Sequence, residues 1–169
     1  MIKIIGATLV LLGAGGFGLS KALLFYHQFH QLREFLGAVE ILKCELNYTL
    51  SPLPVLCERT AERTRGACSR FFRIYAEKLD KIGARSRAAA AAMEETKGLS
   101  LPPDGKMAVL ELLSSLGRYD LDGENRLLQL TGQRLRSALE RLEKDKKPMA
   151  RGYAVLGVTT GIALVILFI

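Results

Sequence analysis

The sequence predicts an all-α protein: an antiparallel bundle of five to six helices flanked by two transmembrane helices. Apolar residues recur at helical spacing through the middle of the chain, and long uncharged apolar segments lie at both ends. No strand-like alternation of apolar and polar residues is found. We therefore divide the 169 residues into an N-terminal transmembrane helix (1–26), a cytoplasmic helical domain (27–148) and a C-terminal transmembrane helix (149–169).

The first apolar segment, residues 4–20, carries no charge and lies between Lys3 and Lys21. As a helix it is about 25 Å long, slightly short of the hydrocarbon core, and the two lysines can extend to the membrane surfaces. A cleavable signal peptide is the alternative interpretation. The small residues at 13–18 lie inside the apolar run and no A-x-A site precedes Lys21, which favours a retained membrane helix.

The C-terminal segment, residues 152–169, is uncharged and apolar all round, which favours a membrane helix over a buried core helix. Gly157 and Gly161 form a GxxxG pattern, whose small residues allow two helix backbones to pack closely. Basic residues flank both segments on their central side, at Lys21 and within residues 141–151. The positive-inside rule therefore predicts a cytoplasmic central domain.

The central helices follow in order. The first helix is expected to continue from the membrane to about Tyr48, with an apolar face of Leu32, Phe35, Leu36, Val39, Leu42 and Leu46. A turn at 49–54 follows, with Ser51 as N-cap and Pro52 as first residue of a helix that ends near Gly66. Its inner face consists of Leu53, Leu56, Cys57 and Ala61.

A third helix is expected from about Ala67, with Phe71, Phe72, Tyr75, Leu79 and Ile82 facing inward, and Gly83 bends or ends it. Ser86 then caps a fourth segment that reaches Lys97. Arg85 and Arg87 at its start oppose the helix dipole. Either this segment continues the third helix, or tertiary contacts hold it.

Residues 98–105 are predicted as a loop. The next helix has Val109, Leu112, Leu113 and Leu116 on one face and Gly117 as C-cap. Asp120 or Asp122 starts the last central helix, and Pro148 is a candidate kink before the C-terminal segment. The inner face of the last central helix consists of Leu128, Thr131, Leu135, Ala138, Leu139 and Leu142.

No constellation for catalysis is found. The chain has no phosphate-binding loop, no HExxH and no G-x-S-x-G motif, and its two histidines, His27 and His30, are interpreted as interfacial residues. The three cysteines include no CxxC pair, so we expect reduced thiols that fill the core and no zinc site. The sequence therefore predicts a protein that is not an enzyme and uses no cofactor or metal.

The formal net charge of +7 includes a run of arginines at Arg59, Arg63, Arg65, Arg70 and Arg73. Acidic neighbours dilute this run and no aromatic stacking platform accompanies it, so a solvated or protein-binding face is favoured over nucleic acid. The alternative function is a membrane-tethered basic domain that binds anionic lipid or DNA. Such a domain would bind with steep salt dependence.

Several short motifs occur in a characteristic order and spacing, followed by the lysine-rich approach to the C-terminal segment. The motifs are Gln31-Leu32-Arg33, Leu42 with Glu45 and Tyr48, Ser51-Pro52-Leu53-Pro54, and Leu113-Ser-Ser-Leu116-Gly117 with Asp120. With these motifs, the chain resembles the stage III sporulation protein AB family of endospore-forming bacteria over almost its full length. Two departures are the run of alanines at 88–92, where a Trp is expected, and Glu124, where Gln is expected.

The resemblance implies a role in sporulation, in a multiprotein complex that links mother cell and forespore. The central domain would resemble that of the inner-membrane platform (F) protein of type II secretion systems. By this analogy the chain is a membrane scaffold of the mother-cell membrane around the forespore that docks a secretion-type ATPase, the stage III sporulation protein AA. Other stage III sporulation membrane proteins and membrane lipid are further expected partners. The candidate contacts are Arg59, Arg63, Arg70, Pro52, Gly117 and Asp120.

Overall fold

The computed structural model describes the backbone of residues 2–49 and 51–168, and the side chains of residues 23–49 and 51–144. The described backbone forms helices joined by short connections and contains no strand. This confirms the predicted all-helical class. The helices are α1 (Ile2–Thr49), α2 (Leu53–Arg63), α3 (Gly66–Ile82), α4 (Arg85–Glu95), α5 (Pro103–Ser115) and α6 (Leu121–Phe168).

The chain divides into two compact units, one made of residues His30–Glu140 and the other of Met1–Phe29 with Arg141–Ile169. Among the residues searched, which are those with described side chains, no helix is long and apolar enough to cross a membrane. The apolar segments at 4–20 and 152–169, including Gly157 and Gly161, lie outside that part of the chain. The two transmembrane helices therefore stay predictions.

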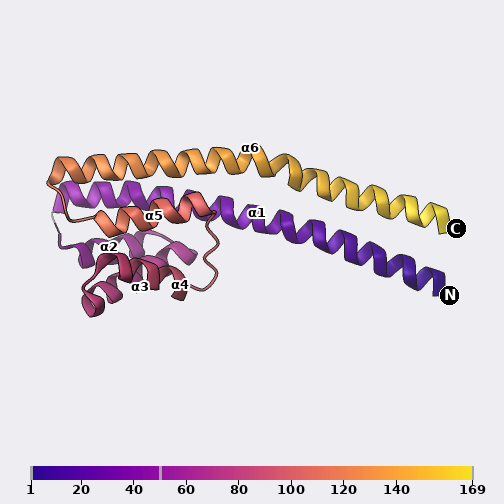
Figure 1. Ribbon diagram of the computed structural model, residues 1–169, viewed down its shortest axis with the longest axis horizontal. Helices are drawn as coiled ribbons and strands as arrows, with labels where there is room; N and C mark the ends of the chain where they lie inside the picture. Colours follow the sequence, from indigo (N-terminus) through magenta and orange to yellow (C-terminus); the bar gives the residue numbers. More distant parts are fainter. Residues whose placement is uncertain (1, 50, 169) are drawn as a thin grey trace. The chain divides into compact units, whose positions relative to one another are not determined.

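Within the unit His30–Glu140, successive helices run in alternating directions (Figure 1). α1 and α6 lie side by side, α5 lies next to them, and α2, α3 and α4 complete the bundle (Figure 1). The α1–α2, α3–α4 and α5–α6 connections consequently meet at one end, which we call the corner end. The α2–α3 and α4–α5 connections lie at the opposite end.

Aromatic side chains fill the centre of this bundle. Phe35 of α1 lies 5.4 Å from Phe71 and 6.0 Å from Phe72 of α3, measured between ring centroids. Tyr75 stacks on Phe71 at 6.4 Å and donates a hydrogen bond from its hydroxyl to the carbonyl of Leu113, at 2.8 Å. All four rings are buried, so burial of apolar surface joins α1, α3 and α5.

The predicted inner faces are largely confirmed. Leu32, Phe35, Val39 and Leu42 of α1 are buried, as predicted, whereas Leu36 is only half-buried. Cys57 and Cys68 are buried core residues, but the expectation that all three thiols fill the core is wrong for Cys44. The remaining predicted core residues that are buried are Leu56, Ala61, Phe71, Phe72, Tyr75, Val109, Leu112, Leu113, Leu116, Leu128, Thr131, Leu135, Ala138 and Leu142.

Several helix boundaries differ from prediction. Gly83 adopts a left-handed conformation with φ of 68° and ends α3, so α4 is a separate helix. α4 begins at Arg85 without a side-chain cap, which places Ser86 inside its first turn. Pro52 precedes the first residue of α2 and does not itself start the helix.

The loop predicted at 98–105 is shorter than expected because α5 begins at Pro103. The ring of proline holds φ near the helical value, and the first turn requires no N–H donor from it. Gly105 is therefore a helical residue, and it allows close packing on α1: a Cβ added there would lie 2.6 Å from Cδ2 of Leu32.

Candidate functional site

The two arginines predicted to bind a partner from α2 are engaged within the chain. Nη1 of Arg59 lies 3.1 Å from Oε2 of Glu45, and Nη1 of Arg63 lies 2.8 Å from Oε1 of the same carboxylate. The Glu45 side chain is only 5% exposed, whereas those of Arg59 and Arg63 are 43% and 58% exposed. The arginines thus compensate a buried charge on α1.

Arg70, the third predicted arginine, lies on α3 and faces the α4–α5 connection. Its Nη2 donates a hydrogen bond to the carbonyl of Lys97 at 3.1 Å. It also lies 3.6 Å from the position that a Cβ on Gly98 would occupy. The three predicted arginines are therefore tied to two different parts of the bundle, and each has an internal structural contact.

Pro52, Gly117 and Asp120, the remaining predicted contacts, all lie at the corner end. Gly117 follows α5 with φ of 79°, a conformation that glycine adopts without strain. Asp120 precedes α6, and its Oδ1 accepts a hydrogen bond from the N–H of Gly123 at 3.1 Å. This confirms Asp120 as the residue that starts α6.

Glu124 organises the turn between α5 and α6, a role that the sequence analysis missed. Its Oε1 accepts hydrogen bonds from the backbone N–H groups of Gly117, Arg118 and Tyr119 at 2.8, 2.9 and 3.0 Å. The residue is 3% exposed, and its Oε2 is buried without a hydrogen-bond partner. The sequence signal that could have revealed this role is a glutamate one turn after the Asp120 N-cap, which itself follows the glycine turn at Gly117.

Arg85 joins α4 to the same turn. Its Nη2 lies 3.4 Å from the position that a Cβ on Gly117 would occupy, and Leu53 of α2 lies 3.9 Å from that position. Three connections of the bundle therefore meet around Gly117. Glycine at this position allows the guanidinium to lie against the backbone of the turn.

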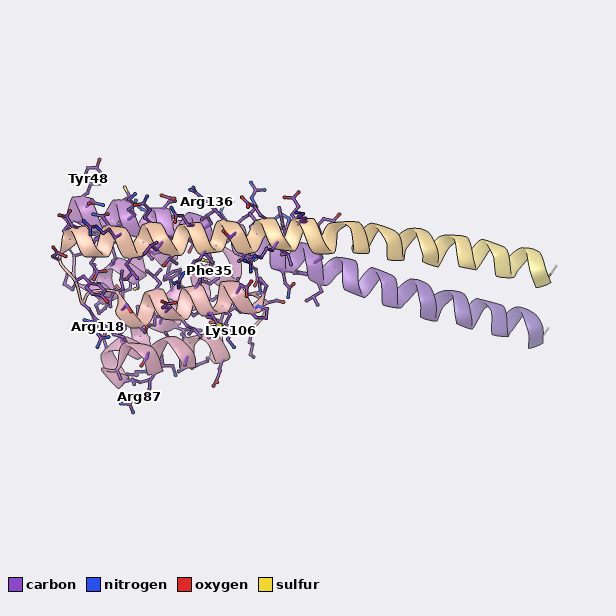
Figure 2. All side chains as sticks on the ribbon, turned by 45° about the horizontal axis from the view of Figure 1, so that its top comes forward. Phe35, Tyr48, Arg87, Lys106, Arg118 and Arg136 are labelled. Atoms are coloured by element: carbon purple, nitrogen blue, oxygen red, sulfur yellow. The ribbon has the colours of Figure 1, made fainter. Side chains whose placement is uncertain are left out.

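Apolar and aromatic side chains are exposed at the corner end. Tyr48 is 84% exposed and Tyr119 is 58% exposed, and Leu121 is also exposed. The side-chain amides of Asn47 and Asn125 exchange two hydrogen bonds of 2.9 Å, which fix the end of α1 against the first turns of α6. Tyr48 and Arg118 accordingly lie toward the same end of the bundle (Figure 2).

The buried polar side chains of the described residues all bond to the chain itself. Gln31 donates from Nε2 to the carbonyl of Gly98 and accepts at Oε1 from the N–H of Ser100, both at 2.6 Å. Thr60, Thr96 and Thr131 donate to carbonyls of their own helices. Together with Glu45 and Glu124, these account for the buried polar set, so each of these side chains has a structural role.

The described part of the chain also has a groove and two buried thiols. A groove of about 180 Å³ lies between α1 and α6, and the ion pair between Glu40 and Arg136 crosses it at 3.2 Å. No group of three or more metal-ligating residues occurs among the described side chains. Burial raises the pKa of the Cys57 thiol to about 12 and raises that of Cys68 further, so both thiols are protonated near neutral pH.

A family model described as stage III sporulation protein AB matches residues 3–169. The chain belongs to this family. The stage III sporulation protein AB of Bacillus subtilis (strain 168) is 22% identical over 172 residues, which cover 99% of both chains. A solved structure of a stage III sporulation protein AB aligns with a TM-score of 0.63 and 20% identity, over 71% of this chain and 96% of that one. At this identity, the solved structure supports the fold.

The motifs that carry the family resemblance have identifiable structural roles. Gln31 binds the α4–α5 connection, and Glu45 pairs with two arginines of α2. The backbone carbonyl of Leu113 accepts a hydrogen bond from the hydroxyl of Tyr75. Gly117 and Asp120 form the turn into α6. The exception is Tyr48, whose side chain projects from the end of α1 (Figure 2).

Proposed function

We propose that this protein is a non-enzymatic membrane scaffold of a stage III sporulation complex, and that its helical bundle docks a secretion-type ATPase at the membrane. The ATPase expected from the family resemblance is the stage III sporulation protein AA. The apolar segments 4–20 and 152–169 would anchor the chain in the mother-cell membrane around the forespore, with residues 27–148 on the cytoplasmic side.

One observation supports this proposal: every buried polar side chain described in the bundle forms a hydrogen bond or ion pair with another group of the same chain. An enzyme requires polar groups directed at a substrate, usually in a cleft. Here Gln31, Glu45 and Glu124 each bind groups of the same chain, at helix connections or between helices. Such an arrangement supports a rigid body whose function lies on its surface.

A flotation experiment tests the proposal. The full chain is reconstituted into neutral phosphatidylcholine liposomes, the purified ATPase is added, and the mixture is centrifuged in a density gradient. We expect the ATPase to float with liposomes that carry the chain and to stay at the bottom with empty liposomes. An ATPase that stays at the bottom in both cases would exclude the docking function.

The same gradient separates this function from the alternative of a basic domain that binds lipid or DNA. Binding to anionic lipid or DNA is dominated by phosphate contacts and weakens steeply with salt. We expect flotation of the ATPase from neutral liposomes to persist at physiological salt. Retention of a DNA duplex by the liposomes, without retention of the ATPase, would support the alternative.

A further inference from the structure

We propose that the ATPase binds through an acidic segment to a defined surface at the corner end, which we call the corner surface. This inference rests on the proposed function and specifies where and by what chemistry the partner is recognised. Arginines from the first turn of α4 and from the α5–α6 connection make up the surface, together with exposed aromatic and apolar side chains. Its residues are Tyr48, Arg85, Arg87, Arg118, Tyr119 and Leu121.

The first argument is charge. In the described part of the chain, no carboxylate lies within ion-pairing distance of Arg85, Arg87 or Arg118. By contrast, Arg59 and Arg63 compensate Glu45. Arg85 is half-buried against the turn, whereas Arg87 and Arg118 are exposed. The guanidinium groups of Arg87 and Arg118 are therefore available to carboxylates of another molecule, which arginine can bind in bidentate geometry.

Three carboxylates lie near the corner surface and keep their negative charge, although the turn binds two of them. Oδ1 of Asp120 accepts the N–H of Gly123, and Oε1 of Glu124 accepts three backbone N–H groups while the residue stays buried. Asp122 lies in the first turn of α6, where the helix dipole favours a negative charge. A partner therefore meets both signs of charge at the corner surface, and its carboxylates would bind the exposed guanidinium groups of Arg87 and Arg118.

The second argument is composition. Tyrosine and arginine are enriched among the residues that dominate binding energy at protein interfaces. Tyr48 and Tyr119 are the most exposed tyrosines with described side chains, and Leu121, two residues after Tyr119, is also exposed. Figure 2 shows Tyr48 and Arg118 at the corner end, with Arg87 projecting outward from α4 on the side of the bundle opposite Tyr48. The partner segment should therefore combine carboxylates with at least one apolar side chain.

The third argument is rigidity. Glu124 holds residues 117–119 through three hydrogen bonds, and the paired amides of Asn47 and Asn125 hold α1 against α6. Arg85 packs against Gly117 of the same turn. A surface fixed in this way loses little conformational entropy when a partner binds.

The test uses the full chain in detergent micelles and the purified ATPase, with the dissociation constant measured by biolayer interferometry. The variant Arg118→Ala with Tyr119→Ala removes two exposed side chains and keeps the backbone N–H groups that bind Glu124. The matched control is Arg73→Ala with Met107→Ala, which removes one exposed guanidinium and one exposed apolar side chain away from the corner end. Far-UV circular dichroism of each variant checks that the helices are intact.

We expect binding to weaken at least about tenfold in the corner variant, and by less than about twofold in the control. Tyr48→Ala should weaken binding as well. Equal affinity of the corner variant and the wild-type chain would overturn this inference and leave the proposed function intact. No binding by the wild-type chain would overturn both. A corner variant that loses self-association but keeps ATPase affinity would assign the surface to a second copy of the chain and also overturn the inference.

Discussion

Two buried glutamates show how single residues connect the helices of this bundle. Glu45 on α1 lies within 3.1 Å of two arginines on α2, and Glu124 on α6 binds the turn that follows α5. A buried carboxylate without such partners is strongly unfavourable. Each glutamate therefore imposes a specific position on a neighbouring element. We expect substitution of the partners to reveal the cost of the uncompensated charge.

The double variant Arg59→Ala with Arg63→Ala leaves Glu45 buried without a cation. We expect the free energy of unfolding to fall by about 2–3 kcal/mol, less than for a fully buried pair because both arginines are partly exposed. Either single variant should lose less than half of this, since the second arginine remains. Chemical denaturation of the full chain, followed by circular dichroism, measures the difference. A double variant as stable as wild type would contradict the assigned role of Glu45.

The three cysteines should differ in reactivity because only Cys44 is exposed. At pH 8 we expect a thiol reagent to modify Cys44 in the native chain, and to modify Cys57 and Cys68 only after denaturation.

Burial raises the pKa of the Cys57 thiol to about 12, so the unfolded chain loses this proton at a lower pH than the folded chain does. Stability should be unaffected by the thiol at lower pH and decrease above about pH 8.5. Rapid modification of all three native thiols would contradict this assignment.

At the scale of elements, α4 forms against its own helix dipole because its neighbours hold it. Arg85 lies at its N-terminus and Glu95 at its C-terminus, the reverse of the favourable arrangement. Lys78 of α3 pairs with Glu95 at 2.6 Å, and Arg85 packs against Gly117. Ala88, Ala89 and Ala92 are completely buried, and their small side chains allow α4 to pack closely on adjacent helices. Tertiary contacts therefore stabilise α4 despite the unfavourable charges at its ends.

Packing between α1 and α5 depends on Gly105. In Gly105→Ala the new Cβ would lie 2.6 Å from Cδ2 of Leu32, a side chain that is 1% exposed. We expect the overpacked core to lower the free energy of unfolding by about 1–3 kcal/mol. The matched control is Gly37→Ala on α1, where the new Cβ meets no atom within 4 Å. There, helix propensity predicts a gain of about 0.5–1 kcal/mol. Thermal unfolding of both variants should give shifts of opposite sign.

The turn between α5 and α6 should depend on Glu124. Glu124→Ala removes the acceptor of three backbone N–H groups, and we expect a loss of about 2–3 kcal/mol. Glu124→Gln keeps one acceptor oxygen and should lose less, although its bonds are no longer charge-assisted. Glu94→Ala, at an exposed position of α4, is the control and should change stability by less than about 0.5 kcal/mol. Equal stability of all three variants would show that the turn does not need this carboxylate.

At the scale of the whole molecule, helical periodicity predicts most of the bundle core. Leu32, Phe35 and Leu42 repeat at the spacing that places them on one side of α1, and they are buried. Glycine and aspartate likewise mark the ends of helices, as at Gly83 and Asp120. These signals are local, so a single sequence contains them.

The candidate site was less predictable because its contacts join distant residues. The arginines of α2 form a basic run in the sequence, but Glu45, 14 residues before Arg59, compensates Arg59 and Arg63. The position of Arg85 beside Gly117 depends on how α4 packs against the α5–α6 turn. Local patterns do not contain such pairings, and only the assembled bundle reveals which arginines lack an internal partner.

We propose that the terminal apolar segments anchor this bundle in a membrane. Extraction of bacterial membranes with alkaline carbonate tests it, because this treatment releases peripheral proteins and leaves integral ones in the bilayer. We expect the full chain to stay in the membrane pellet, and a chain of residues 27–148 to appear in the supernatant. Recovery of the full chain in the supernatant would contradict anchoring by the terminal segments.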